Sequence, residues 1–161
     1  MKTIEIYTDG SCNNNKKAKE LARVGGAGYV LVFGEYEKGV SVGSFINTNS
    51  ARMEMMGILK ALEEIKSLRY SINIYCDCKH IVDTINTGML ESMTVHVDIA
   101  MRKNPDLWYR IKNIYCKLGG ARKVSVHWVR GHDGNKYNEM ADKLADVGRR
   151  KLEVIEDHKR E

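Results

Sequence analysis

The pattern Ile-x-Ile-Tyr-x-Asp occurs twice in this chain, as Ile4-Glu5-Ile6-Tyr7-Thr8-Asp9 and as Ile72-Asn73-Ile74-Tyr75-Cys76-Asp77. Both copies are rich in β-branched and aromatic residues, which predicts that each forms a strand ending on an acid. A helical pattern over 49–68 lies between them, and a strand–helix–strand unit places its two strands parallel in one sheet. In matching register, Asp9 and Asp77 would lie at one sheet edge, on backbones roughly 5 Å apart.

This pair of acids predicts a metal site. Like charges at that separation repel, so either one acid takes up a proton or a cation lies between them. The carboxyl edge of an open α/β sheet is also where ligands bind. The thiols of Cys76 and Cys78 offer an alternative set of metal ligands. In a continuing strand, however, both thiols would lie on the face opposite Asp77, and we expect no thiolate site there.

The composition indicates one globular domain, because 161 residues with 43% hydrophobic content can form a sizeable core. The formal charge of +5 and the pI near 9.0 are compatible with a polyanionic partner, although such values are common among soluble proteins. No leader-like segment opens the chain and no apolar run reaches membrane-spanning length, which favours a cytoplasmic location. The four cysteines lack the spacing of a secreted scaffold and are expected to be reduced.

The remaining pattern predicts further elements around this unit. Two more strands, the second ending at Phe33 and the third covering 36–45, follow the first strand as a hairpin. The other expected elements are helices over 51–67, 79–86 and 106–118, a possible helix ending near Met101, a last strand over 123–129 and a helix from about Lys136. Residues 149–161 carry charges of both signs and are expected to form a helical extension or tail.

Two more acids lie at core-facing helix positions. Glu54 shares a helix face with Ile58 and Ile65, and Asp142 lies beside the apolar stripe of the last helix. An acid in a first helical turn complements the helix dipole, which alone would explain Glu54. Four carboxylates in one site would carry about −4 and coexist only with cations. Oxygen ligands select Mg²⁺ or Mn²⁺, and two such ions roughly 4 Å apart support in-line displacement at phosphorus.

Six motifs resemble those of type 1 ribonucleases H, in the same order and along nearly the whole chain. They are Tyr7-Thr8-Asp9-Gly10-Ser11-Cys12, Arg52-Met53-Glu54, Tyr75-Cys76-Asp77, Asn104-Pro105-Asp106-Leu107-Trp108, His127-Trp128-Val129-Arg130-Gly131-His132 and, after Asn138, Ala141-Asp142-Lys143-Leu144-Ala145. Each match alone is weak, and together they are specific.

The resemblance implies an α/β, ribonuclease H-like fold, in which a five-stranded mixed sheet has its first three strands antiparallel and the others parallel. Residues 1–148 would form the catalytic domain. The implied activity is endonucleolytic cleavage of the RNA strand of an RNA–DNA hybrid by a monomer with two Mg²⁺ ions, for which Mn²⁺ substitutes, leaving 5′-phosphate and 3′-hydroxyl ends. The alternatives are a catalytically inactive hybrid-binding module, a junction resolvase or integrase core, and a reverse-transcriptase domain. The presence of all four acids disfavours the inactive module. The spacing of the acids and the Gly-His loop disfavour the resolvase or integrase core. The start at Met1 favours a free enzyme over a reverse-transcriptase domain.

The resemblance also implies roles for individual residues. The metal ligands would be Asp9, Glu54, Asp77 and Asp142, with Asp9 bridging both ions. His132, on a Gly-flanked loop, would assist proton movement or product departure without binding metal. Contacts to the hybrid in its shallow minor groove would come from Gly10, Ser11, Cys12, Asn14, Asn15, Thr48, Asn49, Lys79 and Asn138.

The charge distribution departs from the family pattern. The segment that corresponds to the family's basic handle, 89–104, has a net charge of zero. The loop after the first strand is basic instead, with Lys16, Lys17, Lys19 and Arg23 against Glu20. This loop is either solvated or in contact with phosphates, and we hypothesise that it partly replaces the handle as the electrostatic contact to the hybrid.

Overall fold

The computed structural model describes residues 2–13, 23–92 and 102–157, whose strands form one six-stranded sheet in the order β5-β4-β1-β2-β3-β6. The strands are β1 (Thr3–Cys12), β2 (Val24–Phe33), β3 (Tyr36–Ile46), β4 (Ser71–Cys76), β5 (Val124–Trp128) and β6 (Ile155–Glu156). The helices are α1 (Ser50–Glu64), α2 (Lys79–Asn86), α3 (Met89–Ser92), α4 (Pro105–Lys117), the 3₁₀ helix η2 (Gly120–Arg122) and α5 (Lys136–Arg149). No helix in these segments is long and apolar enough to cross a bilayer.

The two copies of the repeated pattern are neighbouring parallel strands. Ile4 of β1 lies opposite Ile72 of β4, and Tyr7 lies opposite Tyr75, so the copies are in matching register as predicted. β1, β2 and β3 are antiparallel to one another, whereas β5 is parallel to β4. The predicted mixed topology is therefore confirmed.

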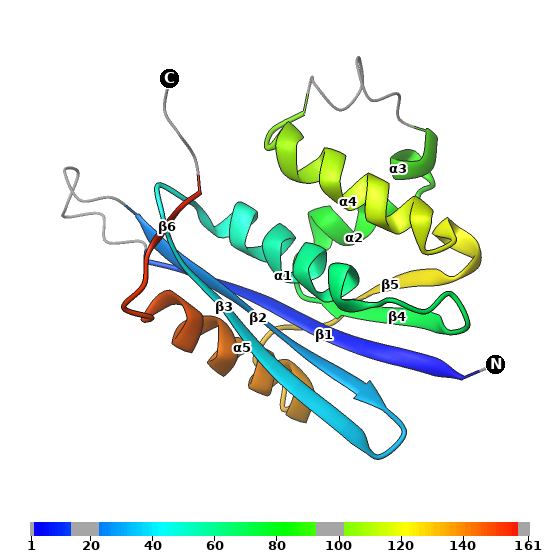
Figure 1. Ribbon diagram of the computed structural model, residues 1–161, viewed down its shortest axis with the longest axis horizontal. Helices are drawn as coiled ribbons and strands as arrows, with labels where there is room; N and C mark the ends of the chain where they lie inside the picture. Colours follow the sequence, from blue (N-terminus) through cyan, green and yellow to red (C-terminus); the bar gives the residue numbers. More distant parts are fainter. Residues whose placement is uncertain (1, 14–22, 93–101, 158–161) are drawn as a thin grey trace.

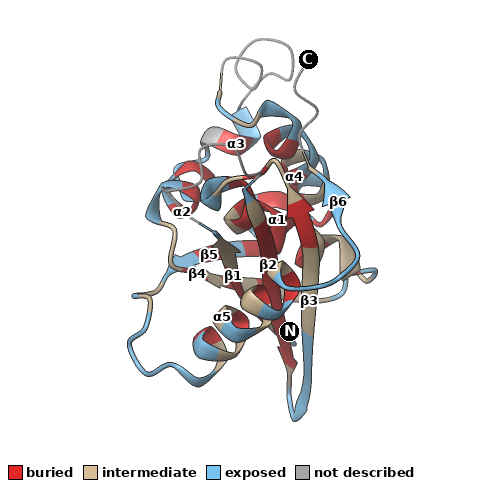
Figure 2. Cartoon of the chain, turned by 90° about the vertical axis from the view of Figure 1, so that its left-hand side faces the viewer, coloured by how far each residue is buried: buried red, intermediate tan, exposed pale blue. Residues whose placement is uncertain are grey.

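The sheet has a helical layer on each face. α1, α2 and α4 lie on one side and α5 lies on the other (Figure 1). Alternation along the strands sends Ile6 and Ile74 into the larger core beneath α1, and Tyr7 toward α5. Burial is concentrated in α1 and the central strands, and the sheet edges are more exposed (Figure 2). The glycines of β2 allow close packing, since a Cβ on Gly28 would lie 2.5 Å from the backbone nitrogen of Ala145 in α5.

Most predicted helices have the expected bounds, and two differ. α1 begins after the N-cap residue Asn49, whose side chain accepts a hydrogen bond from the backbone N–H of Arg52 at 2.9 Å. It ends at Glu64, earlier than predicted, because the next residue, Ile65, adopts an extended conformation and is buried. The helix expected to end near Met101 is present only as α3, and residues 93–101 lie outside the described part of the chain.

The segment after α5 corrects the sequence-based expectation. The helical alternative for 149–161 is wrong where the structure describes it, since α5 ends at Arg149 and Ile155–Glu156 forms β6. This short strand pairs in parallel with the end of β3, with Phe45 opposite Ile155. The sheet therefore has six strands among the described residues, instead of the expected five.

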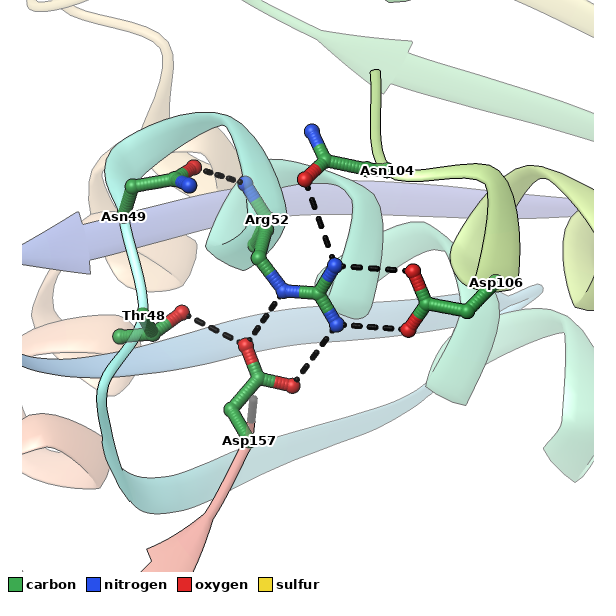
Figure 3. Close-up of polar contacts among 6 residues, drawn as sticks. All are labelled: Thr48, Asn49, Arg52, Asn104, Asp106 and Asp157. Atoms are coloured by element: carbon green, nitrogen blue, oxygen red, sulfur yellow. Dashed lines mark hydrogen bonds and ion pairs between the residues drawn. The ribbon is translucent and has the colours of Figure 1, made fainter. Parts of the chain in front are cut away.

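A buried arginine explains why the chain returns to the sheet. Arg52 in α1 donates one hydrogen bond to Asn104, two to Asp106 and two to Asp157, at 2.6–3.3 Å (Figure 3). These bonds occupy all five donors of the guanidinium group. The side chains of Arg52 and Asp157 are only 3% and 4% exposed, so neither charge could be buried without its partner. Asp157 thus anchors the C-terminal segment beside the hydroxyl of Thr48, which donates to it at 2.8 Å.

Candidate active site

The structure brings together the four acids that the sequence predicts. Asp9 lies in β1, Asp77 directly follows β4, Glu54 is in the first turns of α1 and Asp142 is in α5. The carboxyl group of Asp9 interacts with the charge of Asp77 and, within hydrogen-bonding reach, with Glu54 and Asp142. The first strand does not end on its acid as expected, because β1 continues to Cys12. An interior position of β1, the end of β4 and one helix from each face of the sheet therefore meet at Asp9.

Burial and mutual repulsion make three of these acids, Asp9, Glu54 and Asp77, hard to ionise. Burial, and next the charge of Asp77, raise the pKa of the Asp9 carboxyl from 3.8 to about 7. Burial followed by the charges of Asp9 and Asp77 raises the pKa of Glu54 well above its ordinary value. Burial also raises the pKa of Asp77, an effect that the charge of His132 opposes. At neutral pH such a group of acids either retains protons or binds cations.

The position of Glu54 fits a bound cation. Gly10 lets β1 approach α1 closely, because a Cβ at Gly10 would lie 2.5 Å from the backbone nitrogen of Glu54. The Oε2 atom of Glu54 is buried and has no hydrogen-bond donor among the residues that the structure describes. A buried carboxylate oxygen without a donor is unfavourable unless a cation or a proton occupies its lone pairs. Together with the other three carboxylates, it provides the all-oxygen ligand set that Mg²⁺ or Mn²⁺ prefers.

Cys76 lies closer to this site than the sequence predicts. We expected its thiol on the face opposite Asp77, but β4 ends at Cys76, and strand alternation does not extend to the next residue. The Sγ atom of Cys76 and carboxylate oxygens of Glu54 and Asp77 all lie within 4.8 Å of one another. Only the place where the strand ends could have indicated this arrangement.

The loop after β5 packs against Asp77. A Cβ on Gly131 would lie 2.8 Å from Oδ2 of Asp77, so a larger residue there would displace this carboxylate. His132 is exposed, has a positive φ of 58° and interacts electrostatically with Asp77. Trp128, which the sequence reasoning did not assign to the site, donates from Nε1 to the backbone oxygen of Asp77 at 3.1 Å. The side chain of Trp128 therefore helps to hold the backbone of Asp77.

The predicted substrate contacts occupy different environments. Gly10, Ser11 and Cys12 complete β1 beyond Asp9, and the Ser11 hydroxyl accepts a hydrogen bond from Nε of Arg149 at 3.2 Å. Lys79 is exposed at the start of α2. In α5, Asn138 is buried one helical turn before Asp142, and its Oδ1 atom has no hydrogen-bond partner within the described ranges.

Other predicted contacts are engaged elsewhere or lie outside the description. Asn49 caps α1, and Thr48 is 5% exposed with its hydroxyl bonded to Asp157. The Oδ1 atom of Asn49 and the hydroxyl of Thr48 are therefore already engaged within the protein in this conformation. Asn14 and Asn15, the three lysines of the basic loop and most of the handle lie outside the described residues.

Comparison with known proteins identifies the family. The family model described as RNase H matches residues 1–150. The chain belongs to the ribonuclease H family. Relatives include the ribonuclease H of Syntrophomonas wolfei, 35% identical over 152 residues that cover 90% of this chain and 94% of the relative. The ribonuclease HI of Campylobacter jejuni is 38% identical over 145 residues, covering 90% of each chain.

A solved structure agrees with this assignment. The crystal structure of LC9-RNase H1, described as a type 1 RNase H with the type 2 active-site motif, matches with a TM-score of 0.72 and 25% identity. The match covers 92% of this chain and 72% of that one. Membership of the ribonuclease H family, whose enzymes are endoribonucleases that use divalent metal, is thus supported over the resolvase and reverse-transcriptase alternatives.

Proposed function

We propose that this ribonuclease H, acting as a monomer through residues 1–148, hydrolyses the RNA strand of RNA–DNA hybrids with Mg²⁺ and leaves 5′-phosphate and 3′-hydroxyl ends. The observation that carries the proposal is the convergence of Asp9, Glu54, Asp77 and Asp142, three of which have raised pKa values. Family membership supports the same activity.

The four carboxylates would hold two Mg²⁺ ions, with Mn²⁺ as a substitute. When bound, such ions supply activation of the attacking water and charge neutralisation at the phosphate. Asp9, which interacts with Asp77, Glu54 and Asp142, would be a ligand to both ions. Glu54 would contribute its unpaired Oε2 atom, and the indole of Trp128 would keep the backbone of Asp77 in place.

Other residues would position the hybrid and move protons. His132 is exposed beside Asp77, where its imidazole can take up a proton or assist departure of the product. The backbone of Gly10, Ser11 and Cys12 lies beyond Asp9 at the end of β1, where it can contact ribose 2′-hydroxyl groups. Those contacts would distinguish the RNA strand from DNA.

A cleavage assay tests the proposal. Labelled RNA–DNA hybrid, duplex DNA, duplex RNA and single strands should be incubated with and without Mg²⁺. We expect cleavage of the hybrid only, in the RNA strand and only with metal. Asp77→Asn should abolish it, whereas Asp133→Asn, an exposed acid on the neighbouring loop, should leave it intact. Full cleavage by Asp77→Asn would contradict the metal-ligand assignment.

A further inference from the structure

We infer that Glu54, Cys76 and Asp77 form a second, thiolate-containing metal site that binds Zn²⁺ or Cd²⁺ and competes with the catalytic ions. The Cys76 thiol and the two carboxylates come from β4, the residue after it and α1, and their ligand atoms lie within 4.8 Å of one another. Two of these ligands also belong to the four-acid cluster. Occupation by a thiolate-preferring ion therefore excludes the arrangement that we propose for Mg²⁺.

The geometry needs only a small adjustment to hold such an ion. Zinc binds sulfur at about 2.3 Å and carboxylate oxygen at about 2.1 Å in a tetrahedron, which sets ligand atoms roughly 3.6 Å apart. The ligand atoms lie up to about 1 Å farther apart than this, so binding requires the side chains to move together by about that distance. Three protein ligands and one water would complete the tetrahedron.

Two of the three ligand residues, Cys76 and Glu54, have buried ligand atoms. The Sγ atom of Cys76 is buried and accepts a hydrogen bond from the backbone N–H of Cys78 at 3.4 Å, which fixes the sulfur in place. In Glu54, the Oε2 atom is buried without a donor in the described part of the chain. A neutral thiol cannot satisfy this oxygen as well as a cation can.

The chemistry of the donor set selects the ion. Thiolate ligands favour Zn²⁺ and Cd²⁺, whereas Mg²⁺ takes oxygen ligands, so Cys76 adds affinity for soft ions alone. When the metal–sulfur bond forms, the thiol proton passes to solvent and the sulfur carries the negative charge to the ion. Metal binding by the thiolate is independent of the proposed function. Only the inhibition of hybrid cleavage that should result rests on the proposed function.

Cadmium titration tests the binding without any activity measurement. Cadmium bound to a thiolate gives an ultraviolet charge-transfer band, which can be followed in the metal-free Cys116→Ser protein to remove the exposed thiol. We expect saturation at one equivalent, and a loss of affinity of roughly 100-fold in the additional variant Cys76→Ser, since even a metal's outer partners are worth 10–100-fold. Mg²⁺ should raise the apparent dissociation constant for Cd²⁺.

Two matched variants separate this site from its neighbours. Cys78→Ser removes the adjacent thiol, and Asp142→Asn removes a carboxylate of the four-acid cluster that lies outside the soft-metal group. Both should keep the cadmium band, whereas Asp77→Asn should weaken it even if Cys76→Ser fails to fold. An unchanged band in Cys76→Ser or Asp77→Asn, or its loss in Cys78→Ser, would overturn the inference.

Inhibition provides the second measurement. Zn²⁺ added at fixed Mg²⁺ should inhibit hybrid cleavage, and Cys76→Ser, normalised to its own rate with Mg²⁺ alone, should require roughly 100-fold more Zn²⁺. Equal inhibition of both proteins would show that Zn²⁺ acts without Cys76. If the protein cleaves no hybrid, the proposed function fails, while the cadmium titration still decides whether the thiolate site exists.

Discussion

Asp9→Asn should make the metal-free protein more stable, although the substitution removes a central residue of the site. Folding raises the pKa of this carboxyl from 3.8 to about 7, first through burial and then through the charge of Asp77. One pKa unit corresponds to about 1.4 kcal/mol, so the ionised group destabilises the folded protein by up to about 4 kcal/mol at pH 8. The folded state holds the proton more tightly than the unfolded state does. The penalty is therefore absent below about pH 4 and grows until the pH passes about 7.

Thermal and denaturant unfolding in a chelator can measure this difference. At pH 8 the melting temperature of Asp9→Asn should exceed that of the natural sequence by roughly 10 °C, at 2–4 °C per kcal/mol. At pH 5 the expected gain falls to about 2 kcal/mol. Saturating Mg²⁺ should reduce or reverse the difference, because only the natural sequence retains all four ligands. The control Asp133→Asn should change neither curve. A lower melting temperature for metal-free Asp9→Asn at pH 8 would refute the clustering of charge at this site.

Three further predictions address other parts of the molecule. His132→Ala should slow turnover while hybrid affinity changes little, as steady-state kinetics and a separate binding titration can show. A parallel fall in affinity would mean that His132 holds the substrate. Asp157→Ala should cost roughly 3–5 kcal/mol in denaturant unfolding because it leaves Arg52 buried with unpaired donors, whereas exposed Glu156→Ala should cost less than about 0.5 kcal/mol. Equal costs would contradict the anchoring role. Replacing the three lysines of segment 14–22 with glutamine should raise KM and lower the salt slope of hybrid binding by roughly two to three units. An unchanged slope would show that these lysines do not contribute to the electrostatic contact with the hybrid.

Local patterning made the centre of the fold predictable. The two Ile-x-Ile-Tyr-x-Asp copies place their apolar residues at alternate positions, and the connecting helix requires a parallel crossover. Their register therefore followed from the sequence, and Tyr7 does lie opposite Tyr75. Glu54 and Asp142 stood out for a similar reason, since a carboxylate on or beside an apolar helix face needs a partner.

Long-range contacts made other parts unpredictable. β6 contains two residues, too few for a periodic pattern, and its place depends on Arg52 more than a hundred positions earlier. The thiol of Cys76 was placed away from Asp77 because alternation was continued past the end of β4. Likewise, the hydrogen bond from Thr48 to Asp157 depends on tertiary packing, which local sequence propensity cannot predict.

The Arg52–Asp157 pair also affects when the packing around α1 can be completed during protein synthesis. The partners are 105 residues apart in the sequence, and ribosomes add roughly 5–20 residues per second. Arg52 therefore leaves the ribosome roughly 5–20 s before its buried partner. During that interval, closing the core around α1 would bury a guanidinium group with part of its donors unpaired. A nascent chain from which Asp157 has not yet emerged therefore cannot complete its native packing. Its apolar surface stays exposed to chaperones during that time.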